Sequence, residues 1–570
     1  MALIKMQNFS FAYPGDEGRA LSEINLSVEQ GEFVVLCGPS GSGKTTLLRN
    51  LKKEISPVGK NTGSITYKGI PFSELQDELS AKEIGMVFQD PENQIVMDTV
   101  IHELAFSLEN FGCKPDVIKK NIAEMVTFFG LEDCLYKPVH ELSGGQKQIM
   151  NLCSVLLLKP RLLLLDEPTS QLDPVSAHEF IKMVYQLNQE FSITVIISEH
   201  RLEQVFPIAD RVVYMDNGYI KYLGTPKEIS KYIIDQNDLE TVQFLPSVTR
   251  LFFHTHEKEV SNWADSIPLT IREGKQFMKK VADRIQNITD DSNINESTCG
   301  KGDNDPDESD KILECSDISF RYDKENPLVL KKLSLSVKKG DFLAVLGGNG
   351  AGKTTLLQMI AGLIKPRCGN VYFKGTKIER IEQKERYCKI GYVAQNPLLH
   401  FTFDTVDAEL QFAVQRAGKA HSGEKLKEMI ALFDLDSILS RHPYDCSGGQ
   451  QQKLALACTL IPEPELLLID EPTKGLDAVS KDRLARLLEE LRHNNLTIVM
   501  VTHDIEFAAN HAKKCAMLFD GSITTCADPT AFFSGNYFYT TAINRAARDY
   551  LPNAVTCKDV MQACNIPERE

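Results

Sequence analysis

Two glycine-rich loops of one pattern stand far apart in the chain. The first runs from Gly38 to Thr45 and the second from Gly347 to Thr354, and both read GxxxxGK followed by threonine. Such glycines let backbone N–H groups turn toward phosphate oxygens at a helix N-terminus. The lysine reaches the β- and γ-phosphates, and the threonine hydroxyl ligates Mg²⁺. Each loop follows an apolar run and precedes a helical stretch, so the sequence predicts two phosphate-binding loops.

An aspartate–glutamate pair ends an apolar run in each half of the chain. Asp166 and Glu167 follow four leucines, and Asp470 and Glu471 follow Leu-Leu-Leu-Ile. Such runs are typical of buried parallel strands, and ligands bind at the carboxyl ends of these strands. The aspartate suits Mg²⁺ coordination, and the glutamate can polarise an attacking water. A lone acid pair is more often a solvated strand end, but its recurrence behind both phosphate loops favours the catalytic interpretation.

A Ser-Gly-Gly-Gln segment precedes each acid pair by the same interval. Ser143 stands 23 residues before Asp166, and Ser447 stands 23 residues before Asp470. A serine and two glycines ahead of a helical stretch form a second site rich in N–H donors for an anion. The same residues can serve as a plain helix cap. Their constant distance from the acid pair favours the anion site.

The whole arrangement is repeated along the chain. Phe11 recurs as Phe320, 309 residues later, and His200 recurs as His503, 303 residues later. The distance between matching residues thus changes little along the chain, and the motifs keep the same order in both halves. A period of this length indicates a duplicated domain. Apolar β-like runs alternate with helical stretches in both halves, which predicts an α/β fold.

The positions of the motifs suggest domain boundaries. We expect two tandem P-loop NTPase domains, each with a helical subdomain, at residues 1–240 and 312–545. Residues 241–311 are expected to form an appendage, with helical periodicity at 274–285, and a flexible linker. The linker, from residue 289 onward, holds eight acids against two lysines and cannot bury enough apolar surface to fold. Residues 546–570 would form a C-terminal tail.

Composition limits the class of protein. The net charge of −15 over 570 residues argues against a protein that mainly grips nucleic acid, because phosphate backbones are bound by clustered Lys and Arg. The 14 cysteines include no CxxC pair, and the N-terminus lacks a signal sequence, which favours a reducing cytoplasm. The longest apolar runs are strand-sized, so we expect any membrane part to come from other subunits.

With these motifs the chain resembles the ABC ATPase family over nearly everything except the linker and the tail. The resemblance implies ATP and Mg²⁺ as cofactors. It implies catalytic roles for Glu167, Glu471, His200, His503, Gln89 and Gln395. It implies metal contacts from Thr45, Gln89, Asp166, Thr354, Gln395 and Asp470. It implies ATP contacts from Tyr13, Gly38, Pro39, Ser40, Gly41, Ser42, Gly43, Lys44, Thr45, Thr46, Ser143, Gly144, Gly145, Tyr322, Gly347, Gly348, Asn349, Gly350, Ala351, Gly352, Lys353, Thr354, Thr355, Ser447, Gly448 and Gly449.

In that family two such domains pair head to tail around two ATP molecules. The ATP on Lys44 would then be covered by Ser447 and the two glycines after it, and the ATP on Lys353 by Ser143 and the glycines after it. Neither site lacks a catalytic residue, so we expect both to hydrolyse ATP. Cys446 stands where the family usually has leucine, and we expect weaker packing there without loss of the site.

Finer features look like the ATP-binding subunits of energy-coupling factor (ECF) transporters, which import vitamins and transition-metal ions. They are IGMVFQDPENQ at 84–94, SEHRLE at 198–203 and FFSGNYFYTT at 532–541. The resemblance implies a peripheral position at the cytoplasmic face of the cell membrane, with a coupling subunit and a substrate-capture subunit as membrane partners. Arginines of the coupling subunit are expected to meet Asp90, Glu92, Asp98, Asp404 and Asp407, which are alternatively solvated loop acids.

Two other assignments compete with an ECF-type importer. A soluble tandem ATPase acting on ribosomes or DNA would carry a basic helical linker or zinc-binding cysteine pairs, and this chain has an acidic linker and no such pair. A tandem ATPase of a sugar importer commonly has one degenerate half, whereas both halves here are intact. We therefore expect no nucleic acid partner.

Overall fold

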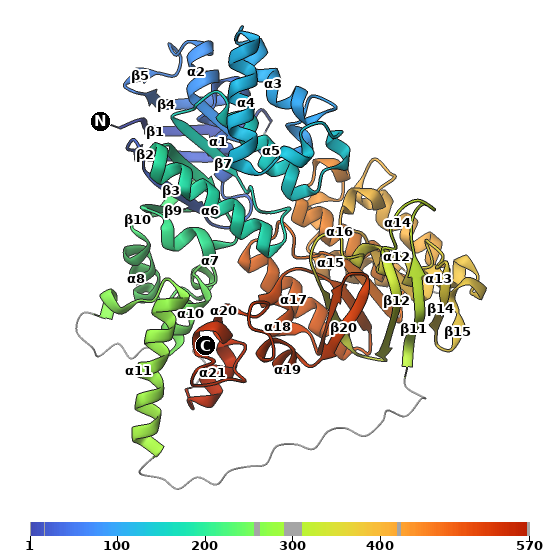
Figure 1. The fold of residues 1–570 in the computed structure, drawn as a ribbon. Coiled ribbons are helices and arrows are strands. Elements are labelled where there is room, and N and C mark those ends of the chain that lie inside the picture. Colours follow the sequence, from blue (N-terminus) through green and yellow to red (C-terminus); the bar gives the residue numbers. More distant parts are fainter. Residues whose placement is uncertain (1, 16–17, 256–262, 290–310, 419–422, 567–570) are drawn as a thin grey trace. The chain divides into compact units, whose positions relative to one another are not determined.

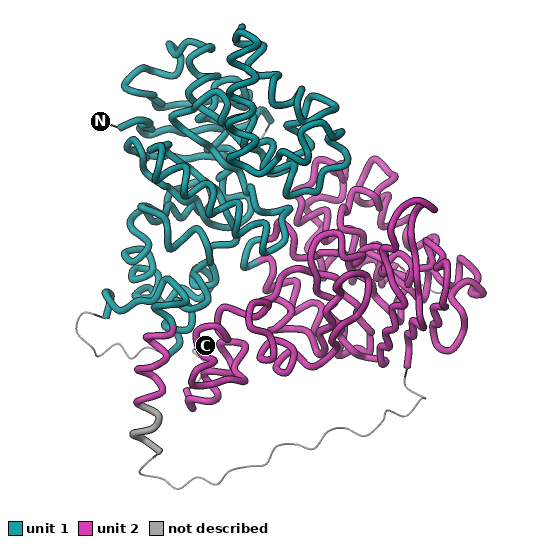
Figure 2. Tube along the Cα trace, in the orientation of Figure 1, with its two compact units in different colours: residues 1–274, 477–479 teal, residues 275–476, 480–570 magenta. Residues whose placement is uncertain are grey.

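The computed structural model describes residues 2–15, 18–255, 263–289, 311–418 and 423–566 (Figure 1). Residues 290–310, which make up nearly all of the predicted acidic linker, lie outside the described residues. The chain divides into two compact units (Figure 2). Unit 1 comprises residues 1–274 with 477–479, and unit 2 comprises residues 275–476 with 480–570.

Unit 1 contains a six-stranded sheet in the order β10-β9-β3-β8-β7-β6. Its strands run parallel except for β10, which pairs antiparallel with β9 at one edge. Uninterrupted apolar sequences form the inner strands because both faces of a parallel sheet are covered. The strands are β3 (Phe33–Cys37), β6 (Ile84–Val87), β7 (Leu162–Asp166), β8 (Thr194–Ser198), β9 (Arg211–Asp216) and β10 (Tyr219–Gly224).

A second, antiparallel sheet of unit 1 has the order β2-β1-β4-β5. Alternate residues of the six-stranded sheet, such as Val34 and Leu36 of β3, share one buried cluster with Ile4 and Met6 of β1. This cluster therefore joins the antiparallel sheet to one face of the parallel sheet. The antiparallel strands are β1 (Ile4–Ala12), β2 (Leu21–Val28), β4 (Lys60–Tyr67) and β5 (Ile70–Pro71).

A group of helices is inserted between β6 and β7, as expected for a helical subdomain. Amphipathic sequences form them, and α4 ends at Gly130, which adopts the left-handed conformation with φ of 65°. The inserted helices are α3 (Val100–Asn110), α4 (Pro115–Phe129) and α5 (Gly144–Leu156). The other α-helices of unit 1 are α1 (Lys44–Asn50), α2 (Asp77–Glu83), α6 (Pro174–Phe191), α7 (Leu202–Val205), α8 (Pro226–Gln236), α9 (Leu239–Val242) and α10 (Ser247–Thr255).

Unit 2 repeats this architecture, with sheets in the orders β16-β17-β18-β13-β19-β20 and β12-β11-β14-β15. Leu343 and Val345 of β13 pack toward the antiparallel sheet, whereas Phe342, Ala344 and Leu346 pack toward helices. The strands are β11 (Lys311–Phe320), β12 (Leu330–Lys338), β13 (Phe342–Leu346), β14 (Cys368–Phe373), β15 (Thr376–Lys377), β16 (Ile390–Val393), β17 (Leu466–Asp470), β18 (Thr497–Val501), β19 (Lys514–Phe519) and β20 (Ser522–Ala527).

The helices of the second half follow the same order, with α14 to α16 inserted between β16 and β17. They are α12 (Lys353–Ile360), α13 (Gln383–Lys389), α14 (Val406–Ala417), α15 (Gly423–Phe433), α16 (Gly448–Leu460), α17 (Ala478–His493), α18 (Ile505–His511), α19 (Pro529–Ser534), α20 (Ala542–Ala547) and α21 (Cys557–Ala563). Helix α11 (Ile271–Thr289) contains the residues with predicted helical periodicity. The predicted α/β fold with two tandem domains and helical subdomains is confirmed. Within the described ranges, no helix has the length and apolar character needed to cross a membrane.

Candidate functional site

The first phosphate loop, residues 38–43, connects β3 to α1 at the carboxyl end of the sheet. Gly38 has φ of 136°, and a Cβ there would lie 2.0 Å from the carbonyl oxygen of Met215. Only glycine is compatible with that backbone and that approach. The Lys44 Nζ donates to the carbonyl oxygens of Gly38 and Pro39, both at 2.9 Å. The lysine is buried, and burial lowers its pKa.

The second phosphate loop, residues 347–352, connects β13 to α12 in the same way. A Cβ on Gly347 would lie 2.4 Å from the carbonyl oxygen of Leu518. The Lys353 Nζ donates to the carbonyl oxygens of Gly347 at 2.9 Å and Gly348 at 3.1 Å. Both predicted loops thus fold alike, each with its lysine held across the loop.

Asp166 ends β7 and lies beside the first phosphate loop. Its Oδ1 accepts a hydrogen bond from Thr45 Oγ1 at 3.1 Å and another from Ser198 Oγ at 2.8 Å. Ser198 ends the neighbouring strand β8, directly opposite Asp166 in the register. Burial raises the pKa of Asp166, and the Ser198 and Thr45 hydroxyls oppose that rise.

Asp470 ends β17 beside the second loop, but its surroundings differ. Both carboxylate oxygens are buried, and neither meets hydrogen-bond geometry with any partner in the described part of the chain. The residue opposite it is Val501, whose side chain has no hydrogen-bond donor. Burial raises the pKa of Asp470 to about 6, although the Thr354 hydroxyl opposes the rise.

Glu167 follows Asp166 in the left-handed conformation, with φ of 43°. Its Oε1 lies 2.8 Å from His200 Nε2, and its Oε2 accepts from Gln89 Nε2 at 2.7 Å. The fold therefore gathers three of the predicted catalytic side chains. Burial raises the pKa of Glu167, but His200 and Lys44 lower it more, so the net pKa lies below the ordinary value.

Glu471 also adopts positive φ, at 50°. Its Oε2 lies 2.7 Å from His503 Nδ1, and its Oε1 lies 3.8 Å from Lys353 Nζ. Burial raises the pKa of Glu471, and His503 with Lys353 lowers it to a net value below the ordinary one. Gln395 is exposed, and the described contacts include no hydrogen bond from it to Glu471. The second half thus brings glutamate and histidine together without the glutamine.

Ser143 and Ser447 cap the helices α5 and α16 that follow them. Each hydroxyl accepts from the N–H of the glutamine three residues later, and that glutamine side chain returns a contact to the serine N–H. A Cβ on Gly448 would meet no atom within 4 Å, and one on Gly144 would meet one only at 3.9 Å. Internal packing therefore does not require glycine at these two positions.

The two tyrosines predicted to contact ATP are hydrogen-bonded to the helices that follow the phosphate loops. Tyr13 OH lies 3.1 Å from Thr46 Oγ1, and Tyr322 OH lies 3.0 Å from Thr355 Oγ1. The Tyr322 ring is 55 % exposed and meets the ring of Phe320 edge-on. Its free face leaves room for a planar ligand.

Cys446 is buried in the unit 2 core, and its thiol donates to the carbonyl oxygen of His442 at 3.6 Å. Burial raises its pKa. The weaker packing expected at this position stays a prediction.

The acids predicted to meet a coupling subunit have mixed surroundings. Asp90 caps the turn at Glu92 and Asn93, and Glu92 forms an ion pair with Lys147. Asp404 is fully exposed. Asp90 therefore has a local structural role as a capping residue, and its role in docking stays a prediction.

Sequence reasoning missed two residues of the first site. It named Ser198 only as part of a family resemblance, and Glu199 without a role. Ser198 holds Asp166, while the buried Glu199 Oε1 accepts from the Thr169 N–H at 3.1 Å and its hydroxyl at 2.7 Å. Comparing the two halves position by position would have flagged them, because Val501 and Thr502 stand there in the second half.

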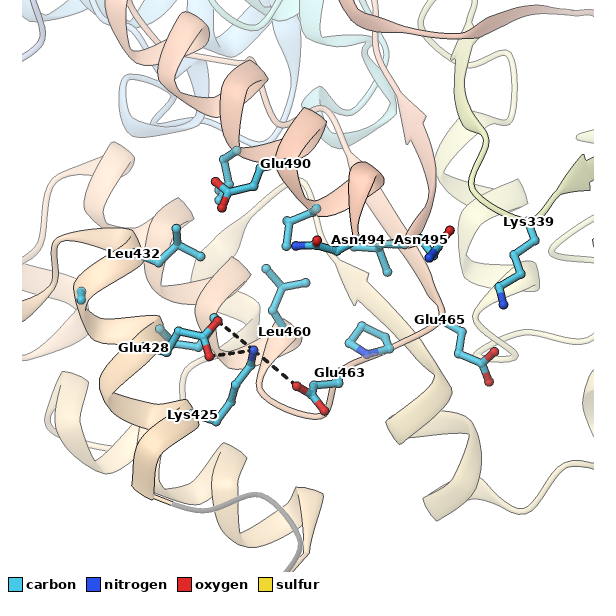
Figure 3. A pocket seen from close by; sticks show the side chains of 16 residues that line it. Lys339, Lys425, Glu428, Leu432, Leu460, Glu463, Glu465, Glu490, Asn494 and Asn495 are labelled. Atoms are coloured by element: carbon cyan, nitrogen blue, oxygen red, sulfur yellow. Dashed lines mark hydrogen bonds and ion pairs between the residues drawn. The ribbon is translucent and has the colours of Figure 1, made fainter.

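A cavity of about 710 Å³ in unit 2 lies away from the predicted site (Figure 3). It is lined by α15, α17 and the loop before β17, where Lys425 lies near Glu428 and Glu463. Glu465 and Leu496, also in its wall, immediately precede β17 and β18. The cavity is therefore at the amino ends of the strands, opposite the edge that carries the phosphate loop.

Comparisons with known proteins point to one family. The family model described as ABC transporter matches residues 21–170 and 330–474. A Bacillus cereus protein provisionally named an ABC transporter ATP-binding protein is 47% identical over 565 residues, which cover 99% of this chain and 98% of that protein. A Clostridium tetani protein of the same name is 33% identical and covers 78% of this chain and 94% of its own length. The solved structure of cbiO1 from Clostridium perfringens, described as part of the ABC transporter complex cbiONQ, is 31% identical. It covers 42% of this chain and 95% of its own, with a TM-score of 0.38.

Proposed function

This chain belongs to the ABC transporter family and is an ATPase, and from that premise we propose that it energises an importer of the ECF type. The finer assignment is carried by the resemblance of residues 84–94 and 532–541 to ATP-binding subunits of that group. The cargo is a vitamin or a transition-metal ion. A membrane coupling subunit and a membrane substrate-capture subunit complete the transporter, and this chain sits on the cytoplasmic face of the membrane.

The residues present fit ATP and Mg²⁺. The phosphate loops turn N–H groups inward at helix N-termini, where polyphosphate is bound. Thr45 and Asp166 place two hard oxygen donors 3.1 Å apart, and Asp470 offers two buried oxygens without partners. Mg²⁺ commonly takes one or two such protein oxygens together with phosphate oxygens and water. When bound, it neutralises charge on the phosphates during transfer.

Glu167 and Glu471 are the proposed general bases. Each side chain is held by a histidine, at 2.8 Å in the first site and 2.7 Å in the second. Their lowered pKa values keep both carboxylates ionised near neutral pH, so each can accept a proton from the attacking water. Lys44 and Lys353 bind the phosphates, and their charge assists transfer.

The test of this ATPase site is the double variant Glu167→Gln with Glu471→Gln. Loss of both bases should reduce turnover by about 10²-fold or more, because general base catalysis contributes on that order. ATP binding should persist, since the phosphate loops are unchanged. Phosphate release and equilibrium ATP binding measure the two effects, with the exposed Glu179→Gln as control. Turnover near the control value would rule out these glutamates as bases.

In this proposal the two halves pair head to tail, so each ATP is completed by the serine of the other half. Lys44 and Ser447 then serve one site, whereas Lys44 and Ser143 serve different sites. Lys44→Ala with Ser447→Ala should therefore keep the turnover of the remaining site. Lys44→Ala with Ser143→Ala should lose nearly all of it. Equal losses in the two double variants would contradict the composite arrangement.

The membrane partners can be tested through two of these acids, the fully exposed Asp404 and the partly exposed Asp407. Asp404→Lys with Asp407→Lys should weaken copurification with membrane proteins encoded beside this gene, because the expected partner surface is basic. ATPase activity of the isolated chain should not change. Intact copurification would exclude these acids from docking.

A further inference from the structure

The two ATP sites differ at one position beside the aspartate. In the first half β8 ends in Ser198, opposite Asp166, and in the second half β18 ends in Val501, opposite Asp470. Both residues are fully buried. The backbone registers match, so the difference lies in the side chain alone: a hydroxyl in one site and two methyl groups in the other.

The Ser198 hydroxyl connects both acids of the first site. It donates to Asp166 Oδ1 at 2.8 Å and accepts from the Glu167 N–H at 3.0 Å. With the bond from Thr45 at 3.1 Å, one oxygen of Asp166 carries two hydrogen bonds. These two bonds restrain the orientation of the Asp166 carboxylate.

The second site has no such restraint. The Val501 side chain offers no donor, so of the two hydroxyls that act on Asp166 only the counterpart of Thr45, the Thr354 hydroxyl, acts on Asp470, and neither Asp470 oxygen meets full hydrogen-bond geometry with a described residue. The Glu471 N–H still donates to the Val501 carbonyl oxygen at 2.9 Å, so the main chain is held as in the first site, while the aspartate side chain lacks the contact that Ser198 gives Asp166.

The next position repeats the contrast. Glu199 holds both the N–H and the hydroxyl of Thr169, on the loop after Glu167, with the hydroxyl contact at 2.7 Å. In the second half Thr502 stands at that position and meets the hydroxyl of Thr473 only at 3.4 Å. The acid-bearing loop is thus tied more firmly in the first site.

We propose that Ser198 is a positioning residue for the metal-binding aspartate of the first site and that, because Val501 replaces it, the two sites hold Mg²⁺ unequally, with the first tighter. Residues that orient a metal ligand through a hydrogen bond typically change metal affinity about 10–100-fold when removed. The inference rests on the proposed function in one respect, the assignment of Asp166 and Asp470 to the metal.

The experiment is a titration of the full chain with Mn²⁺ in the presence of the nonhydrolysable analogue AMP-PNP. Electron paramagnetic resonance measures the Mn²⁺ that remains unbound at each step. Mn²⁺ prefers the same oxygen ligands as Mg²⁺ and reports binding without turnover. The wild type should show two classes of nucleotide-dependent site whose Kd values differ by about 10-fold or more. A single class of two equal sites would overturn the proposal.

Threonine and valine have nearly the same shape, which provides matched variants. Ser198→Thr keeps the hydroxyl and should keep the tight site, whereas Ser198→Val should weaken that site about 10–100-fold. Val501→Thr adds the missing hydroxyl and should bring the weak site toward the tight one. Equal Kd values for the Thr and Val variants at 198 would refute the role of Ser198.

Two further variants separate this inference from the proposed function. Asp166→Asn and Asp470→Asn should each remove one Mn²⁺ class. If they do and the hydroxyl variants change nothing, only the inequality is wrong. If neither aspartate affects Mn²⁺ binding, the metal assignment fails, and the inference fails with it.

Discussion

Asp470→Asn should stabilise the chain in nucleotide-free protein from which metal has been removed with EDTA. The wild-type side chain is a buried carboxylate whose oxygens accept no hydrogen bond from a described residue. Burial raises its pKa from 3.8 to about 6, so the folded unit disfavours the charged form. Asparagine has nearly the same shape and carries no charge to desolvate.

The size of the effect follows from that pKa difference. The rise from 3.8 to about 6 corresponds to about 3 kcal/mol at 1.36 kcal/mol per pH unit. An unpaired buried amide costs about 1 kcal/mol, which leaves a net gain of about 2 kcal/mol. Because the folded state binds the proton more tightly, the wild-type penalty is absent below pH 3.8 and complete above about pH 6. The gain should therefore be full at pH 7.5 and shrink toward pH 4.

Differential scanning calorimetry measures this prediction, since a chain with two units need not unfold in one step. The transition of unit 2 should rise by on the order of 5 °C at pH 7.5. Asp166→Asn is the matched control. Burial raises the pKa of Asp166 as well, but this substitution disturbs the hydrogen bonds from Thr45 and Ser198, so its gain should be smaller than that of Asp470→Asn. A melting point for Asp470→Asn at or below wild type, or a gain independent of pH, would refute the reasoning.

Two further substitutions test local features of the fold. Gly347→Ala should displace the second phosphate loop and abolish nucleotide binding to it, because the added Cβ would lie 2.4 Å from the Leu518 carbonyl oxygen. In the control variant Gly348→Ala the added Cβ meets no atom within 4 Å, so this variant should bind nucleotide normally. A nucleotide titration measures both. Glu203→Ala should free the start of α10, since Glu203 Oε1 accepts from the N–H and hydroxyl of Ser247. Hydrogen exchange should rise at residues 247–255 by an amount equivalent to about 1–3 kcal/mol of local stability, and unchanged exchange would show that other contacts hold the helix.

Much of the fold could be predicted because its signals are local. The apolar runs before Asp166 and Asp470 are buried strands, and the glycine loops connect strands to helices. The serine before Gly144 caps a helix as its type and position indicate. These features depend on residues within a few positions of one another, where backbone sterics and strand burial act directly.

The chain's composition excluded few functions, and its motifs indicated the family that the comparisons show. The repeat of those motifs implied that both sites hydrolyse ATP, because every expected catalytic residue occurs in both halves. The structure brings Gln89 to Glu167 at 2.7 Å, while Gln395 has no such contact among the described residues. A loop side chain can reach more than one position, so spacing along the chain does not decide its contact.

The sequence by itself determined two phosphate loops, two acid-bearing strands and two capped helices, because each is encoded by neighbouring residues. Only the tertiary structure decided what lies against the acids. Ser198 is 32 residues from Asp166 and meets it only because β7 and β8 pair in one register. The same register sets Val501 against Asp470. Strand pairing is a long-range choice, so the contact of Ser198 with Asp166, and its absence at Val501, became visible only once the sheets were in place.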